Sequence, residues 1–218
     1  MKIKIYSLIA FSIIHFSVFA QDKLSFGLRA GINFQNLNGK DATGATLKNN
    51  LVVRYHLGAN LEIPLVPDFY IQPNLLFSTK GASTKYSNFG QSYTSAVNLY
   101  YLELPVNFLY KPLLGKGHLI LGFGPYLAYA LGGKVVTNGN NESIVFKNSS
   151  NANDPNPVYK PLDAGANLLF GYEFASKISF QLNAQLGMLN INPSFDGPGS
   201  TSATQKNTGF GISMGYRF

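Results

Sequence analysis

The chain is poor in the residues on which many enzymes and secreted domains depend. It has no cysteine, so disulfide bonds and thiol chemistry are excluded. Charged residues make up 12% of the sequence, about half the share of an ordinary soluble domain. Only two histidines, His56 and His118, lie beyond the first 20 residues, and they are expected at opposite ends of the predicted fold. This composition disfavours acid–base and metal chemistry before any motif is considered.

Catalytic and cofactor motifs are equally scarce. A catalytic Ser-His or His-Asp pair must lie within hydrogen-bond reach. Only His56 and Asp163 could lie at the same level of the predicted fold. We favour a structural role for that pair. No spacing of histidine and acidic residues matches a metal site. The pair Gly122-x-Gly124 is no nucleotide signature, because no helix follows it. We predict no enzymatic activity, no catalytic residue, no metal and no cofactor.

The N-terminus lacks an apolar run of the ~20 residues that span a membrane comfortably. Two lysines precede an apolar stretch over residues 5–19, which ends in small or modest side chains, as before a signal-peptidase site. Gln21 stands where a lipoprotein needs cysteine. We predict a helical secretory signal peptide over 1–20 and one mature domain over 21–218; a membrane anchor helix is the alternative.

Cleavage would leave 15 basic and 10 acidic residues, a net charge of +5. These basic residues are scattered along the chain and form no cluster or stripe. Nucleic-acid binding needs such a basic patch, so we predict no nucleic-acid partner.

What the sequence does contain is strict alternation of apolar and polar residues. The C-terminal stretch shows it best, because residues 210 to 218 place bulky apolar side chains on one phase and small or charged ones on the other. Eight stretches alternate in this way: 24–34, 52–63, 69–80, 99–110, 118–132, 163–174, 177–189 and 207–218. The aromatic last residue, Phe218, is typical of the closing strand of an outer-membrane barrel.

The apolar phase of these stretches carries no Asp, Glu, Lys or Arg. A lipid-facing Arg or Lys costs about 2–4 kcal/mol at the membrane midplane, which accounts for this exclusion. The polar phase is mostly Gly, Ser, Asn and Gln with isolated ions, which suits a narrow barrel interior better than a solvated surface. The strand charges and histidines on that phase are Arg29, Arg54, His56, Glu62, Lys80, Glu103, His118, Asp163, Glu173 and Arg217.

The connections between the stretches alternate in length. The short ones are 64–68, 111–117 and 175–176, and the long ones are 35–51, 81–98, 133–162 and 190–206. Short periplasmic turns and long external loops are the outer-membrane pattern. We therefore predict an all-β, eight-stranded antiparallel up-and-down transmembrane β-barrel in the outer membrane of a Gram-negative cell. Three prolines inside strands, Pro73, Pro105 and Pro125, predict local bulges or bends.

Three segments carry a resemblance to a known family. They are Tyr101-Leu102-Glu103-Leu104-Pro105, Gly122-Phe123-Gly124-Pro125-Tyr126, and the stretch from Asp163-x-Gly165 to Gly171-Tyr172-Glu173. With them the chain resembles the PorT-type family of outer-membrane β-barrels over nearly its whole mature length. The resemblance implies an eight-stranded barrel in the outer membrane and, through one member, a link to protein secretion. It implies no catalytic residue.

The inward charges predict an ion-pair network that plugs the lumen, because a buried charge persists only when it is paired. Both signs are expected at the periplasmic end, in the middle and towards the outside. The predicted members are Arg29, Arg54, Glu62, Glu103, Asp163, Glu173 and Arg217. A gated or ion-selective path is the alternative, against which the bulky inward side chains Tyr70, Tyr101 and Tyr126 argue.

The functional expectation is a non-enzymatic, monomeric outer-membrane protein with a structural or interaction role. Its partners would be membrane lipid and a protein that meets the external loops, above all residues 133–162. A small-solute channel and a soluble lipocalin-like ligand binder with reversed facing are the two alternatives.

Overall fold

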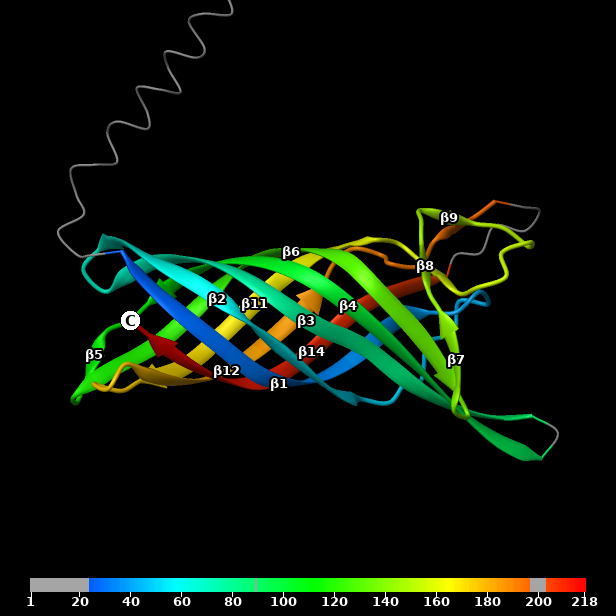
Figure 1. Ribbon diagram of the computed structural model, residues 1–218, viewed down its shortest axis with the longest axis horizontal. Helices are drawn as coiled ribbons and strands as arrows, with labels where there is room; N and C mark the ends of the chain where they lie inside the picture. Colours follow the sequence, from blue (N-terminus) through cyan, green and yellow to red (C-terminus); the bar gives the residue numbers. More distant parts are fainter. Residues whose placement is uncertain (1–23, 89, 197–202) are drawn as a thin grey trace, which may run out of the picture.

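The protein forms a closed cylinder of tilted strands in a computed structural model, which describes residues 24–88, 90–196 and 203–218 (Figure 1). The wall strands in these residues are β1 (Ser25–Lys40), β2 (Val52–Val66), β3 (Phe69–Asn88), β4 (Gln91–Tyr110), β6 (Gly117–Thr137), β11 (Leu162–Glu173), β12 (Ile178–Gly187) and β14 (Thr204–Arg217). Each pairs antiparallel with the next, and β14 pairs with β1 to close the ring. The predicted eight-stranded antiparallel barrel is confirmed.

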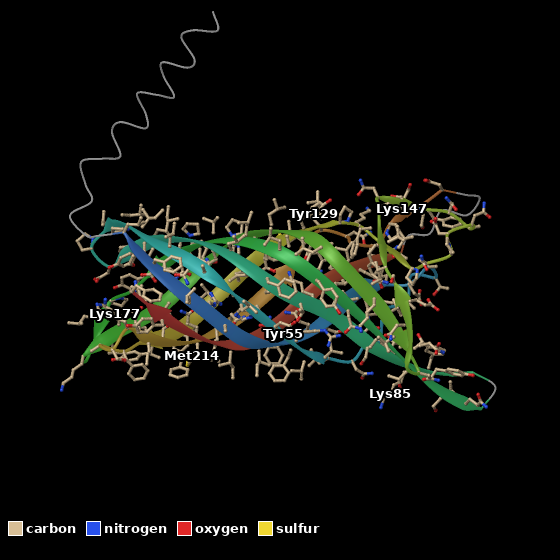
Figure 2. All side chains as sticks on the ribbon, viewed as in Figure 1. Tyr55, Lys85, Tyr129, Lys147, Lys177 and Met214 are labelled. Atoms are coloured by element: carbon tan, nitrogen blue, oxygen red, sulfur yellow. The ribbon has the colours of Figure 1, made fainter. Side chains whose placement is uncertain are left out.

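The apolar phase of the strands faces outward. Tyr55, Tyr129 and Met214 point away from the wall (Figure 2), and each exposes more than half of its surface. The interior instead buries asparagine, glutamine, serine and charged side chains. This facing is the reverse of a soluble ligand-binding barrel, and it excludes the lipocalin-like alternative. No helix in the described residues is long and apolar enough to cross a membrane.

The two ends of the cylinder differ as the connection lengths predict. The short turns and the C-terminus lie at one end, at the left of Figure 1. Asp68 and Lys177 adopt φ values of 67° and 66° there, which lets the chain reverse within a few residues. The turn before β6 includes β5 (Leu113–Leu114), which pairs with the start of β6. The predicted signal peptide, 1–20, lies outside the described residues.

One predicted loop is wrong. Residues 81–88 and 91–98 form the outer parts of β3 and β4, whose pairing continues through Thr84↔Ser95 and Tyr86↔Tyr93. The two tyrosine rings stack with centroids 5.4 Å apart. This hairpin stands beyond the rest of the wall (Figure 1). Its residues need no lipid-facing side, so their Ser-, Thr- and Asn-rich sequence lacks the apolar phase that marks the other strands.

Of the bulges or bends expected at the three strand prolines, the structure contradicts the bulges. On one side of Pro73, Pro105 and Pro125 the ladder skips two residue pairs and then resumes in the same register. On its other side each proline keeps its partner. The register shifts lie elsewhere, at Pro64/Val66 and Tyr100/Tyr101. A proline lacks the single N–H that would face one neighbour, so the ladder loses bonds on that side without inserting a residue.

The external connections are folded onto one another. The turn Asn138-Gly139, with φ values of 48° and 90°, links β6 to β7 (Asn140–Ser143) in a tight hairpin. Further along, β8 (Val145–Phe146) pairs parallel with β10 (Val158–Tyr159). Similarly, β9 (Ser149–Ser150) pairs parallel with β13 (Ser194–Phe195). This pairing joins the connection between β6 and β11 to the connection between β12 and β14, the two longest external connections.

Three loop side chains close the external mouth, and we call them the external lid: Ile144, Tyr159 and Ile191. All three are buried, Ile191 completely. They belong to one apolar cluster with Tyr101 and Tyr126 of the barrel interior. The folded loops therefore extend the barrel core upward over the lumen.

Candidate functional site

Four ionised side chains meet inside the barrel at the end with the short turns. Arg217 of β14 pairs with Glu62 of β2 and with Glu173 of β11. Lys111, the first residue after β4, places its Nζ 3.0 Å from Glu62 Oε2 and 2.9 Å from Glu173 Oε2. Gln72 Nε2 donates a further hydrogen bond to Glu62 Oε1 at 3.1 Å. This periplasmic charge cluster holds two cations and two carboxylates, so its net charge is zero.

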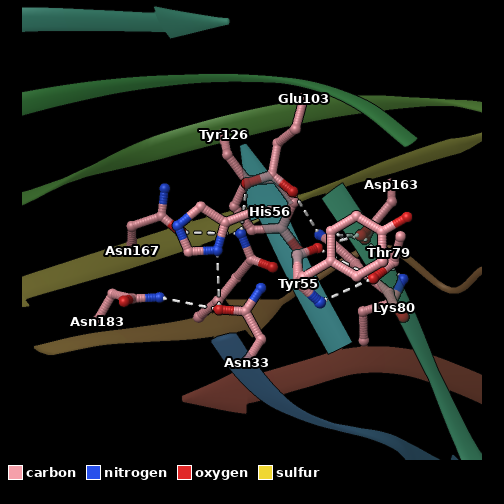
Figure 3. A network of polar contacts seen from close by, with 12 residues as sticks. Asn33, Tyr55, His56, Thr79, Lys80, Glu103, Tyr126, Asp163, Asn167 and Asn183 are labelled. Carbon is pink, nitrogen blue, oxygen red and sulfur yellow. Dashed lines mark hydrogen bonds and ion pairs between the residues drawn. The ribbon is translucent and has the colours of Figure 1, made fainter. Parts of the chain in front are cut away.

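A second cluster lies directly beneath the external lid. Lys80 is fully buried, and its Nζ lies 2.9 Å from Glu103 Oε2 and 3.1 Å from Asp163 Oδ2. Tyr126 and Asn207 donate hydrogen bonds to the same oxygen of Asp163 at 3.2 and 2.9 Å. The ammonium also sits 4.2 Å from the centre of the Tyr126 ring, within the range of a cation–π interaction. Figure 3 shows this outer charge cluster with strands contributing from several sides.

Neutral polar side chains occupy the middle of the lumen. His56 Nδ1 lies 3.0 Å from Asn33 Oδ1, and its Nε2 lies 3.1 Å from Ser213 Oγ. Asn183 completes a ring of contacts, since its Oδ1 accepts a hydrogen bond from Ser213 and its Nδ2 donates to Asn33. Figure 3 shows the contacts of Asn33 with His56 and with Asn183. Both ring nitrogens of His56 are thus engaged, and neither contacts Asp163. The His56–Asp163 pair considered from the sequence does not form.

The contact between Ser213 and His56 has the form of a nucleophile and its base. Both side chains are buried, with exposures of 1% and 3%. The cavity beside His56 measures about 30 Å³, which is room for about two water molecules. No substrate can reach the serine in this arrangement, so the contact is structural here.

Two small cavities lie among the side chains of the lumen. A second cavity of about 20 Å³ lies nearer the periplasmic end, between Glu62, Gln181 and Arg217. Arg29 lines both cavities and is buried to 7% exposure. It interacts electrostatically with Glu103 and brings a second cation towards the outer charge cluster.

The seven side chains of the predicted ion-pair network do not form one network in the structure. Five of them fall into two separate ion-paired groups, and the other two are arginines without an ion pair in the described residues. Glu62, Glu173 and Arg217 meet at the periplasmic end, and Glu103 and Asp163 meet around Lys80. The ion pairs of the described residues include neither Arg29 nor Arg54. Arg54 instead donates to the Val97 carbonyl at 3.1 Å and to Asn98 Oδ1 at 2.7 Å, near the outer rim.

Sequence reasoning missed Lys111, Asn207 and Ser213. Lys111 falls in a predicted turn, but the two carboxylates expected at its level outnumbered their single cation, Arg217. That imbalance was the signal for a further cation nearby. The two polar residues gave no signal, because asparagine and serine are abundant throughout the inward phase.

The external loops carry an ion pair of their own. Lys147 Nζ lies 2.6 Å from Asp154 Oδ1, and the Asn151 amide donates to Asp154 Oδ2 at 2.8 Å. The hydrogen bond from Lys147 holds the pKa of Asp154 below its ordinary value, and the Asn151 bond adds to this. The charged form of Asp154 therefore helps to order residues 147–154.

A closed antiparallel barrel with an apolar exterior and a polar, ion-paired interior defines the class of integral outer-membrane β-barrels. The chain belongs to the outer membrane protein beta-barrel domain family, whose pattern it matches over residues 19–196. It is therefore a protein of the outer membrane. The PorT-type assignment is narrower than this family and stays a prediction.

No curated protein sequence matches the chain. Among solved structures, it is similar to Ail, the attachment invasion locus protein of Yersinia pestis, in complex with the heparin analogue sucrose octasulfate, at 12% identity and a TM-score of 0.43. It is also similar to Neisserial surface protein A, at 10% identity and 0.49, and to a major outer membrane protein from Thermus thermophilus, at 13% and 0.48. Each match covers 90% of this chain and 100% of the other.

Among the described residues, no three His, Asp or Glu side chains are placed to hold a metal ion together. The carboxylates of the periplasmic charge cluster are instead paired with Lys111 and Arg217, and those of the outer charge cluster are paired with Lys80. The absence of a metal or cofactor in the functional protein stays a prediction.

Proposed function

We propose that the protein is a non-conducting, non-enzymatic barrel that presents a preformed external surface to a protein partner. The observation that carries this proposal is the filling of the lumen at three successive levels. These levels are the periplasmic charge cluster, the polar ring around His56, and the outer charge cluster beneath the external lid.

The energetics of the two clusters support a permanent plug. A solute that crosses the lumen must displace both Lys80 and Arg217 from their carboxylates and pass the lid. Separating one member from a buried pair costs about 3–5 kcal/mol, since the remaining charge is left without compensation. Two such barriers in series oppose the small-solute channel that the sequence left as an alternative.

The external surface supports an interaction role because it is already ordered. The β9–β13 pairing joins two loops, the Lys147–Asp154 ion pair holds the loop that contains β9, and the β3–β4 hairpin extends outward. A partner that binds a preformed surface avoids the entropic cost of ordering it. The β7 strand is exposed at all four residues and offers backbone groups on its free edge. A link to protein secretion rests on the family resemblance of the sequence.

Site-specific photo-crosslinking in intact cells tests the interaction role. A photoreactive residue at the exposed position Asn153 or Asn141 should give a discrete protein adduct, because both lie on the external surface. The matched control places the same residue at Lys116, an exposed position in a turn at the opposite end. The proposal fails if correctly inserted protein gives no adduct from any external position, or gives the same adduct from Lys116.

A further inference from the structure

The lipid-facing side of the β1–β14 ladder carries two lysines at its external end. Phe34 and Phe210 face each other across this ladder and stack with ring centroids 5.3 Å apart. They are the last apolar pair before the polar pair Asn36↔Thr208. Above these pairs stand Lys206, opposite Asn38, and then Lys40, opposite Thr204.

In β1 and β14 the even-numbered side chains point outward, as Phe34 and Phe210 do. Lys40 and Lys206 are also even-numbered, so both lie on the phase that faces the membrane. Both are exposed. They are diagonal neighbours across the ladder, a placement in which Cβ atoms lie about 7–8 Å apart. Two ammonium groups at that spacing can approach one anionic group together.

Neither lysine forms an ion pair with an acidic residue in the part of the chain that the structure describes. The ion pairs formed within the described residues involve Lys80, Lys111, Lys147 and Arg217 only. Asp41, the acid next to Lys40 in the chain, turns its Oδ1 towards Thr43 and the Ala45 amide. The positive charge of the pair is therefore free to act on a ligand at the membrane surface.

An apolar hollow of about 420 Å³ lies just below, on the same face of the barrel. Ala184 forms its floor, because this small residue is paired with Phe210 on one side and with Leu168 on the other. The larger side chains Phe34, Phe170 and Leu182 stand around it. In a bilayer this hollow faces hydrocarbon chains, and only an apolar chain can fill it.

We propose that Lys40, Lys206 and the hollow above Ala184 form a binding site for an outer-leaflet lipid with a phosphomonoester headgroup. The phosphate lies between the two ammonium groups, and one acyl chain fills the hollow. Phosphate groups attract basic residues at a membrane surface, and each lysine there contributes to binding. The stacked phenylalanines mark the depth at which headgroup gives way to acyl chain, as aromatic girdles do.

Native mass spectrometry of the full-length mature protein in detergent, with added diphosphoryl lipid A, tests this site. The wild-type protein should retain the lipid, and K40Q/K206Q should bind it about 30-fold more weakly, since two surface charges are lost. A184L, which fills the hollow and keeps both charges, should weaken binding about threefold through lost packing. K116Q, at the opposite rim, is the matched control and should bind as the wild type does.

The probe chemistry separates the sources of the phosphate. Dephosphorylated lipid A should bind the wild-type protein as weakly as diphosphoryl lipid A binds K40Q/K206Q. Phosphatidylglycerol, which carries a phosphodiester, should bind the wild-type protein more weakly than diphosphoryl lipid A does. Equal retention by wild type and K40Q/K206Q would overturn the site, and so would equal loss in K116Q. Tighter binding of phosphatidylglycerol than of lipid A would overturn the phosphomonoester assignment. Heat-modifiable gel mobility of each variant confirms that the barrel has folded.

Discussion

Replacement of Lys80 by methionine tests most sharply how the lumen is held together. Lys80 is completely buried, and its ammonium is shared by Glu103 and Asp163. Methionine keeps most of the volume but leaves two carboxylates facing each other beneath the external lid. Removing one partner of a buried ion pair costs about 3–5 kcal/mol, so K80M should lower the free energy of unfolding by that amount.

The size of the effect follows from what remains around the two acids. Asp163 keeps its hydrogen bonds from Tyr126 and Asn207, and Glu103 keeps Gln185 Nε2 at 2.7 Å and the field of Arg29. These neutral donors and one cation offset part of the lost charge compensation. The expected loss in the free energy of unfolding for K80M is therefore about 3 kcal/mol, at the lower end of the range for buried ion pairs.

Equilibrium urea unfolding in lipid vesicles, followed by circular dichroism and heat-modifiable gel mobility, measures this cost. The double variant K80M/D163N removes one charge of each sign and should recover at least half of the lost stability, because the remaining carboxylate, Glu103, still faces the Arg29 cation. K116M, in an exposed turn, should change stability by less than about 0.5 kcal/mol. A cost below about 1 kcal/mol for K80M, or no recovery in the double variant K80M/D163N, would refute the reasoning.

Three further predictions concern the two ends of the barrel. R217L should destabilise the barrel by about 3–5 kcal/mol, because Glu62 and Glu173 both lose a cation, and unfolding in urea measures this. I191A should cost about 2–5 kcal/mol and speed proteolysis of the external loops, since the lid loses a completely buried side chain. Acidification should loosen the loop around Asp154, because the pKa of Asp154 is lowered in the folded protein. The stability that its charged form contributes is present above the ordinary aspartate pKa of about 3.9 and is lost as the pH falls through the lower folded pKa. Limited proteolysis with pepsin at several pH values should therefore show faster cleavage near residue 154 in the wild type, and no such pH step in D154N.

The strands of the wall could be read from the sequence because lipid imposes a strict rule on them. Every outward position from Phe26 to Phe34 or from Phe210 to Phe218 must be apolar or small, and inward positions need not be. Alternation and charge exclusion together therefore gave the number, direction and facing of the strands. The rule ends where the lipid ends, which is why the outer half of the β3–β4 hairpin was mistaken for a loop.

The lumen was only partly predictable, for a different physical reason. The inward phase identifies which charges enter the barrel, but pairing depends on the stagger between strands that are far apart in sequence. Glu62 and Lys111 are separated by 49 residues, and Lys80 and Asp163 by 83. The external lid was hidden because Ile144, Tyr159 and Ile191 lie in polar loops, in apolar runs of at most three residues that show no periodicity.

Single-channel recording shows whether the lumen is closed. Purified protein inserted into planar lipid bilayers should show no defined unitary current at either polarity, although insertion is verified by protease protection of the barrel. A porin recorded in the same bilayers shows that the assay detects open barrels. Stable, reproducible unitary currents from the pure wild-type protein would contradict the account.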